Sequence, residues 1–282
     1  MNPISVQIAE FTWHAPKAGA ARWAIVGSLH GDEPEGARLI EELIASEPPR
    51  WAQDCPVDLL LVIGNPLALQ RNQRGSVPGA DLNRFFGIHT PSGPAYEQER
   101  AQYLRELLEP VDVVIDIHQA KLPIPLLAVI EDTPHHLTMA SRAGVEMAVI
   151  GADKIYGSTM LADWVNRKGG LGITLETGQA HTPAALEQAH LAVQRLLQFE
   201  SSTPARPPST YEIECALPSP GEDFEFARPL VNGTSVLAGE TLGMSTNGAI
   251  TAPGNGIVFL PREGEPPGEP CMLFARERSF NQ

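Results

Sequence analysis

A buried strand and a polar turn meet in the stretch Trp23-Ala24-Ile25-Val26-Gly27-Ser28-Leu29-His30-Gly31-Asp32-Glu33-Pro34. Continuous apolar residues such as Trp23–Val26 are typical of a strand that is covered on both faces. His30 and Glu33 follow this run three residues apart, so in a turn their side chains can converge on one point. A neutral imidazole and an ionised carboxylate are two of the three protein ligands of a catalytic zinc site. We expect the third ligand at the end of another strand, and His118 follows the apolar run Val111–Ile117.

The pattern around this stretch predicts an α/β domain with a largely parallel or mixed sheet flanked by helices. Apolar runs bounded by turn residues alternate with segments of helical period. The predicted strands are Trp23–Gly27, Val57–Gly64, Val111–Ile117, Leu126–Ile130 and Gly172–Leu175, and the predicted helices are Glu35–Ala45, Tyr96–Leu108, His136–Val149 and Thr182–Phe199.

A second, smaller module is expected after the Pro-rich and Ser-rich segment Ser201–Pro208, which has the composition of a linker. Short apolar runs separated by Gly and Pro follow it without a helical period, which predicts an all-β module. We therefore divide the chain into residues 1–205 and 206–282. The predicted strands of the module are Tyr211–Leu217, Glu222–Leu230, Ser235–Leu242, Gly248–Pro253, Gly256–Leu260 and Cys271–Ala275.

Composition narrows the class of protein. The 282 residues carry a formal net charge of −14, which argues against nucleic acid or a membrane surface as partner, because both attract basic patches. No stretch approaches the roughly 20 apolar residues of a membrane span, and the N-terminal residues lack the basic flank and apolar run of a signal peptide. The three cysteines match no metal-binding spacing, which favours reduced thiols. We expect a cytoplasmic protein.

Further candidate residues lie at the ends of the predicted strands, where open α/β sheets bind ligands. Glu176 closes the run Gly172–Leu175 and is placed to take a proton from a zinc-activated water and deliver it to a leaving amine. Asp116 precedes His118 by two residues on the same strand face, which makes it a candidate acceptor for the imidazole N–H. Arg74 and Arg84 lie in a long polar loop, where a guanidinium binds a substrate carboxylate or stabilises an oxyanion.

Four motifs occur in order: His30-Gly31-Asp32-Glu33-Pro34, Asp81-Leu82-Asn83-Arg84, Asp116-Ile117-His118 and Leu175-Glu176-Thr177-Gly178. Together they resemble the succinylglutamate desuccinylase and aspartoacylase family, a branch of the zinc carboxypeptidase-like (M14-type) hydrolases. The resemblance covers Gly27–Gln179 and implies a carboxypeptidase-like mixed sheet with helices on its faces. The small C-terminal β-module, with a barrel-sandwich-like architecture, also fits the family layout.

The resemblance implies a role for each matching position. His30, Glu33 and His118 would bind one Zn²⁺ per chain, and Glu176 would be the general base and acid. Arg74 would stabilise the oxyanion, and a substrate carboxylate would be held by Asn83 and Arg84.

Two positions depart from the family pattern. Ala120 stands where better-known members have a hydroxyl residue, two positions after the histidine. Aspartoacylase grips an acidic side chain with an arginine about ten residues before its catalytic glutamate. Here Arg167 lies nine residues before Glu176 and Asn166 lies ten before it, so Arg167 is a candidate substrate-binding residue.

We therefore expect a zinc-dependent amidohydrolase that cleaves the amide bond of an N-acyl amino acid or a related small carboxylate. A metallocarboxypeptidase acting on short peptides and a non-catalytic zinc-binding protein are the alternatives, and the sequence leaves a homo-oligomer open. The segments Val236–Glu240 and Ala252–Val258 resemble biotinyl and lipoyl modules, but no lysine follows Lys168, which excludes cofactor carrying.

Overall fold

Strand β3 (Arg22–Gly27) lies inside a large sheet, between β4 (Asp58–Ile63) and β5 (Val113–Ala120). Its alternate side chains are buried on opposite faces: Ile25 packs into one hydrophobic cluster, and its neighbours Ala24 and Val26 pack into another. The computed structural model describes residues 6–9, 11–45, 55–89, 92–197 and 207–278.

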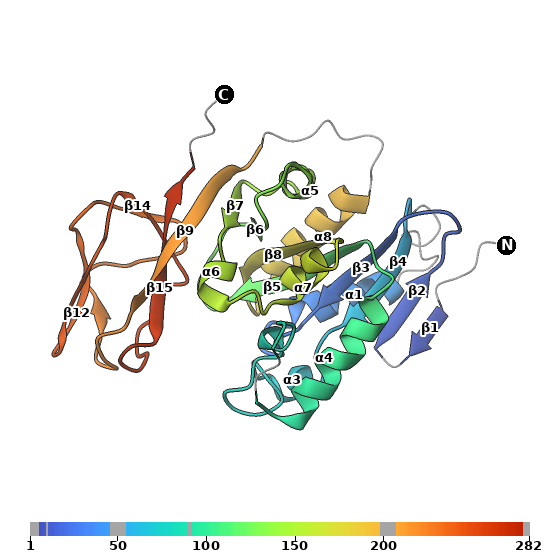
Figure 1. Ribbon diagram of the computed structural model, residues 1–282, viewed down its shortest axis with the longest axis horizontal. Helices are drawn as coiled ribbons and strands as arrows, with labels where there is room; N and C mark the ends of the chain where they lie inside the picture. The colour runs from blue at the N-terminus through green and yellow to red at the C-terminus, as the bar shows by residue number, and fades with distance from the viewer. Residues whose placement is uncertain (1–5, 10, 46–54, 90–91, 198–206, 279–282) are drawn as a thin grey trace.

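The large sheet is mixed, as predicted (Figure 1). Strand β3 pairs in parallel with β4 and β5, and β5 pairs in parallel with β8 (Leu171–Gln179). Antiparallel strands flank this centre: β2 joins β4, and β6 joins β8. The full order is β1-β2-β4-β3-β5-β8-β6-β7-β9-β15-β14-β11, where β1 is Val6–Ala9, β2 Thr12–Ala15, β6 Leu127–Val129 and β7 Met147–Ile150.

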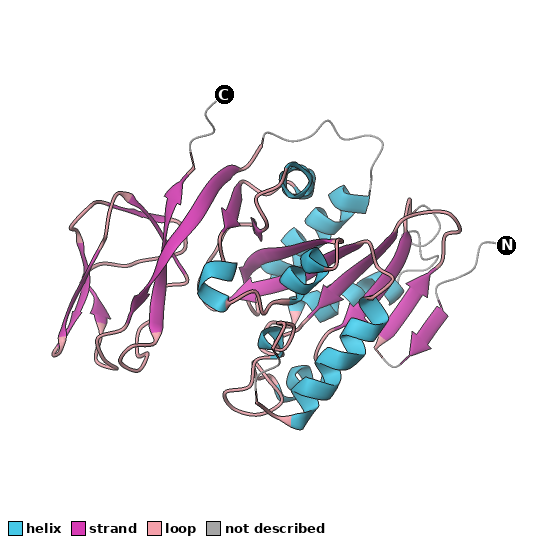
Figure 2. Cartoon of the chain, viewed as in Figure 1, coloured by secondary structure: helices cyan, strands magenta, loops and turns pink. Residues whose placement is uncertain are grey.

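Helices cover both faces of the central strands (Figure 2). Helices α1 (Glu35–Ala45), α5 (Pro134–Ala143) and α8 (Pro183–Leu197) pack into the cluster that contains Ile25. Helices α4 (Ala95–Leu108) and α7 (Leu161–Arg167) pack into the cluster that contains Val26. The short helices α3 (Pro66–Arg71), η1 (Leu82–Arg84) and α6 (Asp153–Tyr156) lie in connections. None of the described helices has the length and apolarity needed to cross a bilayer.

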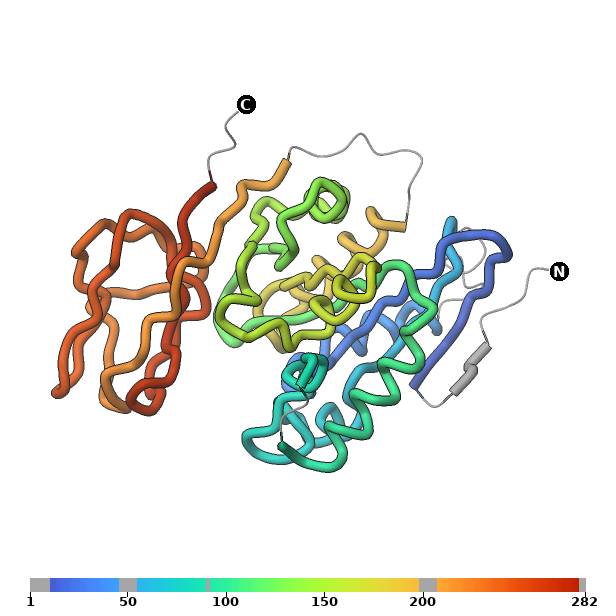
Figure 3. Tube along the Cα trace, in the orientation of Figure 1, coloured from blue at the N-terminus to red at the C-terminus, as the bar shows by residue number. Residues whose placement is uncertain are grey.

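The C-terminal part is all-β and continues the large sheet, because β9 pairs in parallel with β7 (Figure 3). In β14 the side chains of Ile257 and Phe259 pack toward the first part of the chain, and Val258 packs toward a three-stranded second sheet. Strand β14 therefore contributes side chains to two hydrophobic clusters, one on each of its faces. The bounds are β9 Ser209–Pro218, β10 Glu225–Phe226, β11 Thr234–Val236, β12 Thr241–Ser245, β13 Gly248–Thr251, β14 Gly256–Phe259 and β15 Pro270–Glu277.

One predicted helix is wrong in its second half. The segment His136–Val149 is not a single helix, because α5 ends at Ala143 and residues from Met147 form β7. Gly144 adopts φ 77° and its N–H caps the helix, a left-handed conformation that glycine adopts without strain. The predicted strand Ser235–Leu242 is likewise two strands, β11 and β12. The predicted division at residue 205 lies outside the described residues.

Candidate active site

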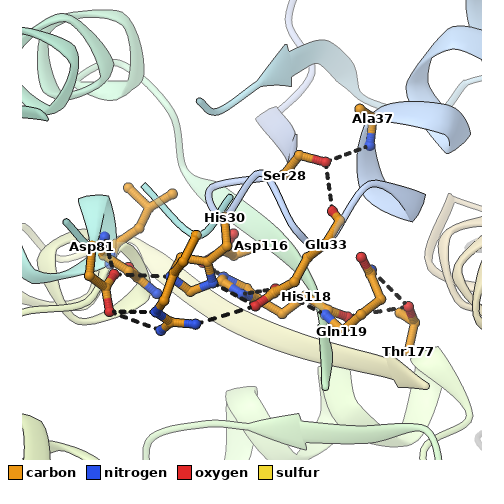
Figure 4. A network of polar contacts seen from close by, with 12 residues as sticks. Ser28, His30, Glu33, Ala37, Asp81, Asp116, His118, Gln119 and Thr177 are labelled. Atoms are coloured by element: carbon orange, nitrogen blue, oxygen red, sulfur yellow. Dashed lines mark hydrogen bonds and ion pairs between the residues drawn. The ribbon is translucent and has the colours of Figure 1, made fainter. Parts of the chain in front are cut away.

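The turn that follows β3 is held by one hydroxyl group. Ser28 adopts a left-handed backbone conformation with φ 56°, which turns the chain out of the strand. Its Oγ donates to the carbonyl of Glu33 at 2.8 Å and accepts from the N–H of Ala37 at 3.1 Å (Figure 4). This hydroxyl therefore ties the turn to the first residues of α1.

Gly31 lets the same turn pack against α3. A Cβ at this position would lie 1.9 Å from the carbonyl carbon of Ala68 and 2.3 Å from the backbone nitrogen of Leu69, both in the backbone of α3. Only a residue without a side chain fits such an approach. The glycine between His30 and Glu33 is therefore a packing requirement of the turn.

His30, Glu33 and His118 converge as the sequence predicts (Figure 4). One carboxylate oxygen of Glu33 lies 2.7 Å from Nδ1 of His30, and the other lies 2.8 Å from Nδ1 of His118. One candidate ligand atom from each of the three residues lies within 4.8 Å of the other two. All three side chains are buried, with 3–7 % of each residue exposed.

The outer nitrogens of both imidazoles meet carboxylates. Nε2 of His30 lies 3.0 Å from Asp81, and Nε2 of His118 lies 3.0 Å from Asp116. Histidines that ligate a metal commonly donate their other N–H to a carboxylate, which fixes the tautomer and orients the ring. Two imidazoles and one carboxylate also make up a known ligand set of catalytic zinc. The donor set and its supporting carboxylates therefore fit zinc.

Charge and burial oppose one another in this cluster. Burial raises the pKa of Glu33, but the charges and hydrogen bonds of His30 and His118 outweigh it and hold the pKa well below its usual range. Burial lowers the pKa of His118, and Asp116 and Glu33 outweigh that effect and raise it well above the usual value. The site thus favours an ionised carboxylate at Glu33, the form that ligates a metal.

Glu176 lies beside this cluster on the neighbouring strand. Its Cα is the register partner of the Cα of His118 in the parallel pair of β5 and β8. Burial raises the pKa of Glu176 to about 7, against the opposing effect of the charge on His118. Its Oε2 is buried and has no hydrogen-bond partner among the described residues. A carboxyl group held in this way is suited to proton transfer near neutral pH.

Two arginines form ion pairs with Asp81, the carboxylate that contacts His30. Arg74 donates to Oδ2 of Asp81 from Nε at 3.2 Å and from a terminal nitrogen at 2.8 Å, and its other terminal nitrogen lies 3.5 Å from Glu33. Arg84 lies 3.6 Å from the same Asp81 oxygen and stacks over the ring of Tyr156 at 4.3 Å. Asp81 therefore fixes both guanidinium groups beside the candidate metal ligands.

Asn83 is positioned by α7. Its Oδ1 accepts a hydrogen bond from the N–H of Leu161 at 2.8 Å, so its amide nitrogen is the group able to donate to a substrate. Only 4 % of the residue is exposed, and it lines the same cavity as the residues above.

The cavity has a volume of about 200 Å³, and the C-terminal part forms one of its walls. Phe259, Leu260 and Arg262 line it from this part, and Asn232 links the two sides. The side chain of Asn232 accepts from the N–H of Leu260 at 2.6 Å and donates to the carbonyl of Pro123 at 3.1 Å. The division of the sequence into two modules provided no sign of this shared wall.

The structure does not bring Arg167 to this cavity. Its guanidinium donates to the carbonyl of Ser158 at 2.6 Å and to the carbonyl of Phe86 at 2.5 Å, and it lines a separate cavity. The side-chain oxygen of Asn166 lies within hydrogen-bond distance of Nε2 of His136 and accepts from the N–H of Gly172. Arg167 lies in the last turn of α7, and its hydrogen bonds hold the loops that contain Ser158 and Phe86.

Asp81 and Tyr156 are site residues to which the sequence assigned no role. Asp81 did have a local signal, because an aspartate before a helical turn is a typical cap, and it accepts from the N–H of Asn83 at 2.9 Å. Its contact with His30 spans 51 positions and has no such signal. Tyr156 belongs to α6, a four-residue helix without a motif.

Curated relatives resemble part of the chain. It is 30 % identical over 106 residues to the N-acyl-aromatic-L-amino acid amidohydrolase (carboxylate-forming) B of Danio rerio, covering 34 % of this chain and 33 % of the relative. It is 35 % identical over 105 residues to a probable aspartoacylase of Nostoc sp., covering 34 % of each. The chain thus matches about a third of the length of these relatives.

Solved structures resemble nearly the whole chain. A succinylglutamate desuccinylase/aspartoacylase from Rhodobacter sphaeroides superposes with a TM-score of 0.76 at 18 % identity, over 96 % of this chain and 89 % of the other. The product-bound ectoine utilization protein EutE (DoeB) from Ruegeria pomeroyi gives a TM-score of 0.76 at 21 % identity, over 94 % and 88 %. At these identities the likeness establishes the fold.

Membership of a family is shown by the match of this sequence to a family model. The model of the succinylglutamate desuccinylase/aspartoacylase catalytic domain matches residues 20–200, which include every motif described above. This range exceeds half of the chain. The protein belongs to the succinylglutamate desuccinylase/aspartoacylase family.

Proposed function

We propose that this protein is a zinc-dependent amidohydrolase that cleaves N-acyl amino acids or closely related small carboxylates. The observation that carries the proposal is the convergence of His30, Glu33 and His118 beside Glu176, which has one buried carboxylate oxygen. Family membership supports it, as do the names of the relatives, which describe an aspartoacylase and an amidohydrolase of N-acyl-aromatic amino acids.

His30, Glu33 and His118 would hold the metal. Bound there, zinc would polarise the amide carbonyl and lower the pKa of a water molecule toward about 7. Asp81 and Asp116 would keep both imidazoles in the tautomer that leaves the inner nitrogen free to ligate.

Glu176 would carry the proton through the reaction. Its carboxylate would take a proton from the attacking water as the new carbon–oxygen bond forms. The same carboxyl group would then give that proton to the nitrogen as the carbon–nitrogen bond breaks. The products are a carboxylate and a free amine.

Arg74, Asn83 and Arg84 would bind the negative charges of the substrate. Arg74 lies 3.5 Å from Glu33, so its guanidinium would stand beside the reacting carbonyl and stabilise the developing oxyanion. Asn83 and Arg84 would hold the carboxylate, because a guanidinium and an amide N–H are its natural donors. We also retain the prediction that the protein works in the cytoplasm as one hydrolase domain with a β-module.

The test combines metal exchange with one substitution. After chelation and dialysis we expect loss of hydrolysis of N-acetyl, N-formyl and N-succinyl amino acids, and recovery on adding one equivalent of Zn²⁺. Glu176→Gln should bind zinc like the wild type and lose about 10²- to 10⁴-fold in kcat. The exposed Glu187→Gln on α8 is the matched control and should retain full activity. Cleavage of dipeptides but not of acyl amino acids would instead identify a carboxypeptidase.

A further inference from the structure

The cavity beside the candidate metal ligands has a second, apolar region. Its walls there come from β6, the segment before it and β7 on one side, and from β9, β14 and β15 on the other. These side chains belong to one hydrophobic cluster, and each residue is 2–8 % exposed. They are Ile124, Leu127, Val149, Ile213, Phe259 and Leu273.

Two of the positively charged side chains of the cavity are held at its polar end. Among the described lining residues the cations are Arg74, Arg84, Lys121 and Arg262. Arg74 and Arg84 are held by Asp81 at the polar end. Arg262 lies 3.6 Å from Glu265 with 44 % of its side chain exposed, and Lys121 is exposed as well. The apolar side chains of this region therefore offer neither a charge nor a hydrogen bond to a second carboxylate.

We propose that this region binds an uncharged, apolar group of the substrate, on one side of the amide bond that is cleaved. The preferred substrates are then N-acyl amino acids with an apolar side chain or an apolar acyl chain, rather than N-acyl derivatives of aspartate or glutamate. The inference rests on the amidohydrolase activity proposed above and specifies its substrate class.

Simple energetics gives the direction and size of the preference. Each methylene group that leaves water for an apolar wall raises kcat/KM by about fourfold when its burial is complete. A carboxylate placed against the same wall loses its hydration without gaining a partner, so a substrate that carries one is rejected. The site at the polar end is satisfied by one carboxylate, which every N-acyl amino acid supplies.

The experiment measures kcat/KM of the zinc-loaded protein for two homologous series. One lengthens the side chain from N-acetylglycine through N-acetylalanine and N-acetylnorvaline to N-acetylnorleucine. The other lengthens the acyl group on glycine from acetyl through butanoyl to hexanoyl. We expect kcat/KM to rise at least tenfold along one series, which identifies the side of the amide that the pocket receives. N-acetylaspartate and N-succinylglutamate should lie below the best apolar substrate by at least tenfold.

The outcomes separate the two proposals. Zinc-dependent cleavage that is fastest with the acidic substrates, with both apolar series flat or falling, overturns this inference and leaves the amidohydrolase proposal intact. Absence of cleavage of every N-acyl amino acid in the presence of zinc overturns both.

A pair of substitutions on one strand locates the preference. Phe259 and Ile257 both face the apolar cluster from β14, but only Phe259 lines the cavity. Phe259→Ala should move the optimum to a longer chain in the preferred series, and Ile257→Ala should leave the order of substrates unchanged. The ratio of two kcat/KM values on one preparation does not depend on the fraction that is folded. An unchanged order with Phe259→Ala would contradict the assignment.

Discussion

The side-chain oxygen of Asn232 accepts a hydrogen bond from the backbone N–H of Leu260 at 2.6 Å, in the wall of the cavity. Leu260 has a left-handed backbone with φ 50°, which costs a leucine about 1 kcal/mol. The amide nitrogen of Asn232 also donates to the carbonyl of Pro123, on the opposite side. One buried side chain therefore holds a strained wall segment and joins it to the rest of the site.

Replacing this side chain should loosen the wall. We expect Asn232→Ala to lower the free energy of unfolding by about 1–3 kcal/mol, because it leaves two backbone groups without their partner. It should also lower kcat/KM more for large substrates than for N-acetylglycine. Asn247→Ala is the matched control, since Asn247 is exposed and donates to the carbonyl of Pro220 away from the cavity. Equal kinetic effects of the two variants would exclude a role for Asn232 in shaping the wall.

Asp116 should set the affinity for zinc through His118. Its Oδ2 meets the outer nitrogen of His118 at 3.0 Å, and the residue is fully buried. Asp116→Asn should weaken zinc binding by about 10- to 100-fold, the usual effect of losing a carboxylate behind a ligating histidine. Competition with a chromophoric chelator measures the dissociation constant.

Asp112→Asn provides the comparison for this experiment. Asp112 lies just before the same strand and accepts from the backbone N–H of Arg22. Its replacement should leave zinc affinity unchanged. A wild-type dissociation constant in Asp116→Asn would show that His118 is oriented without it.

The parts of this site that were predictable from the sequence share one physical basis. His30, His118 and Glu176 each follow an apolar run of the sequence. The strands continue past the predicted ends, so His118 lies within β5 and Glu176 within β8, where the parallel register pairs them. These positions depend on one local turn and on the pairing of neighbouring parallel strands. The motifs are therefore enough to predict that the three residues lie close together.

The parts that were not predictable depend on contacts between distant segments. The hydroxyl of Ser28 holds the turn by two hydrogen bonds to the backbone, and no sequence pattern predicts them. Phe259 lines the cavity because β9 pairs with β7 and so joins the C-terminal part to the large sheet. The segment before β9 has the composition of a linker, and it predicts no such pairing. Arg167 was expected at the substrate by its distance from Glu176 along the chain, yet α7 directs it to the carbonyl groups of Ser158 and Phe86.

Gly31 should tolerate no side chain. A Cβ at this position would lie within 2.3 Å of three backbone atoms of Ala68 and Leu69, and a helix backbone cannot give way as a side chain can. We expect Gly31→Ala to destabilise the fold by about 1–3 kcal/mol through overpacking. Thermal unfolding should show a Tm lower by several degrees.

Gly87→Ala serves as the control for overpacking. A Cβ there would meet a methyl group of Thr159 at 3.2 Å, which a small shift relieves. This variant should lose less stability than Gly31→Ala. A Gly31→Ala protein with the Tm of the wild type would show that α3 can move away from the turn.

Asp58 should make stability depend on acid pH. The carboxylate meets Nε of Arg22 at 2.6 Å, Nε2 of His14 at 2.6 Å and the backbone N–H of Lys17 at 3.1 Å. Burial raises its pKa, but the bonds from Arg22 and His14 outweigh burial and hold the pKa below its usual value. The unfolded chain, with a pKa of about 3.9, therefore binds the proton first as the pH falls.

The stabilisation by Asp58 is then complete above about pH 5 and is lost as the pH falls through its folded pKa. Asp58→Asn should lower the free energy of unfolding by about 1–3 kcal/mol at pH 7, and this difference should shrink steadily below about pH 4. Urea unfolding of both proteins from pH 7 to pH 3 measures it. A difference between the two proteins that stayed constant or grew on acidification would exclude ionisation of Asp58 as the source of the effect.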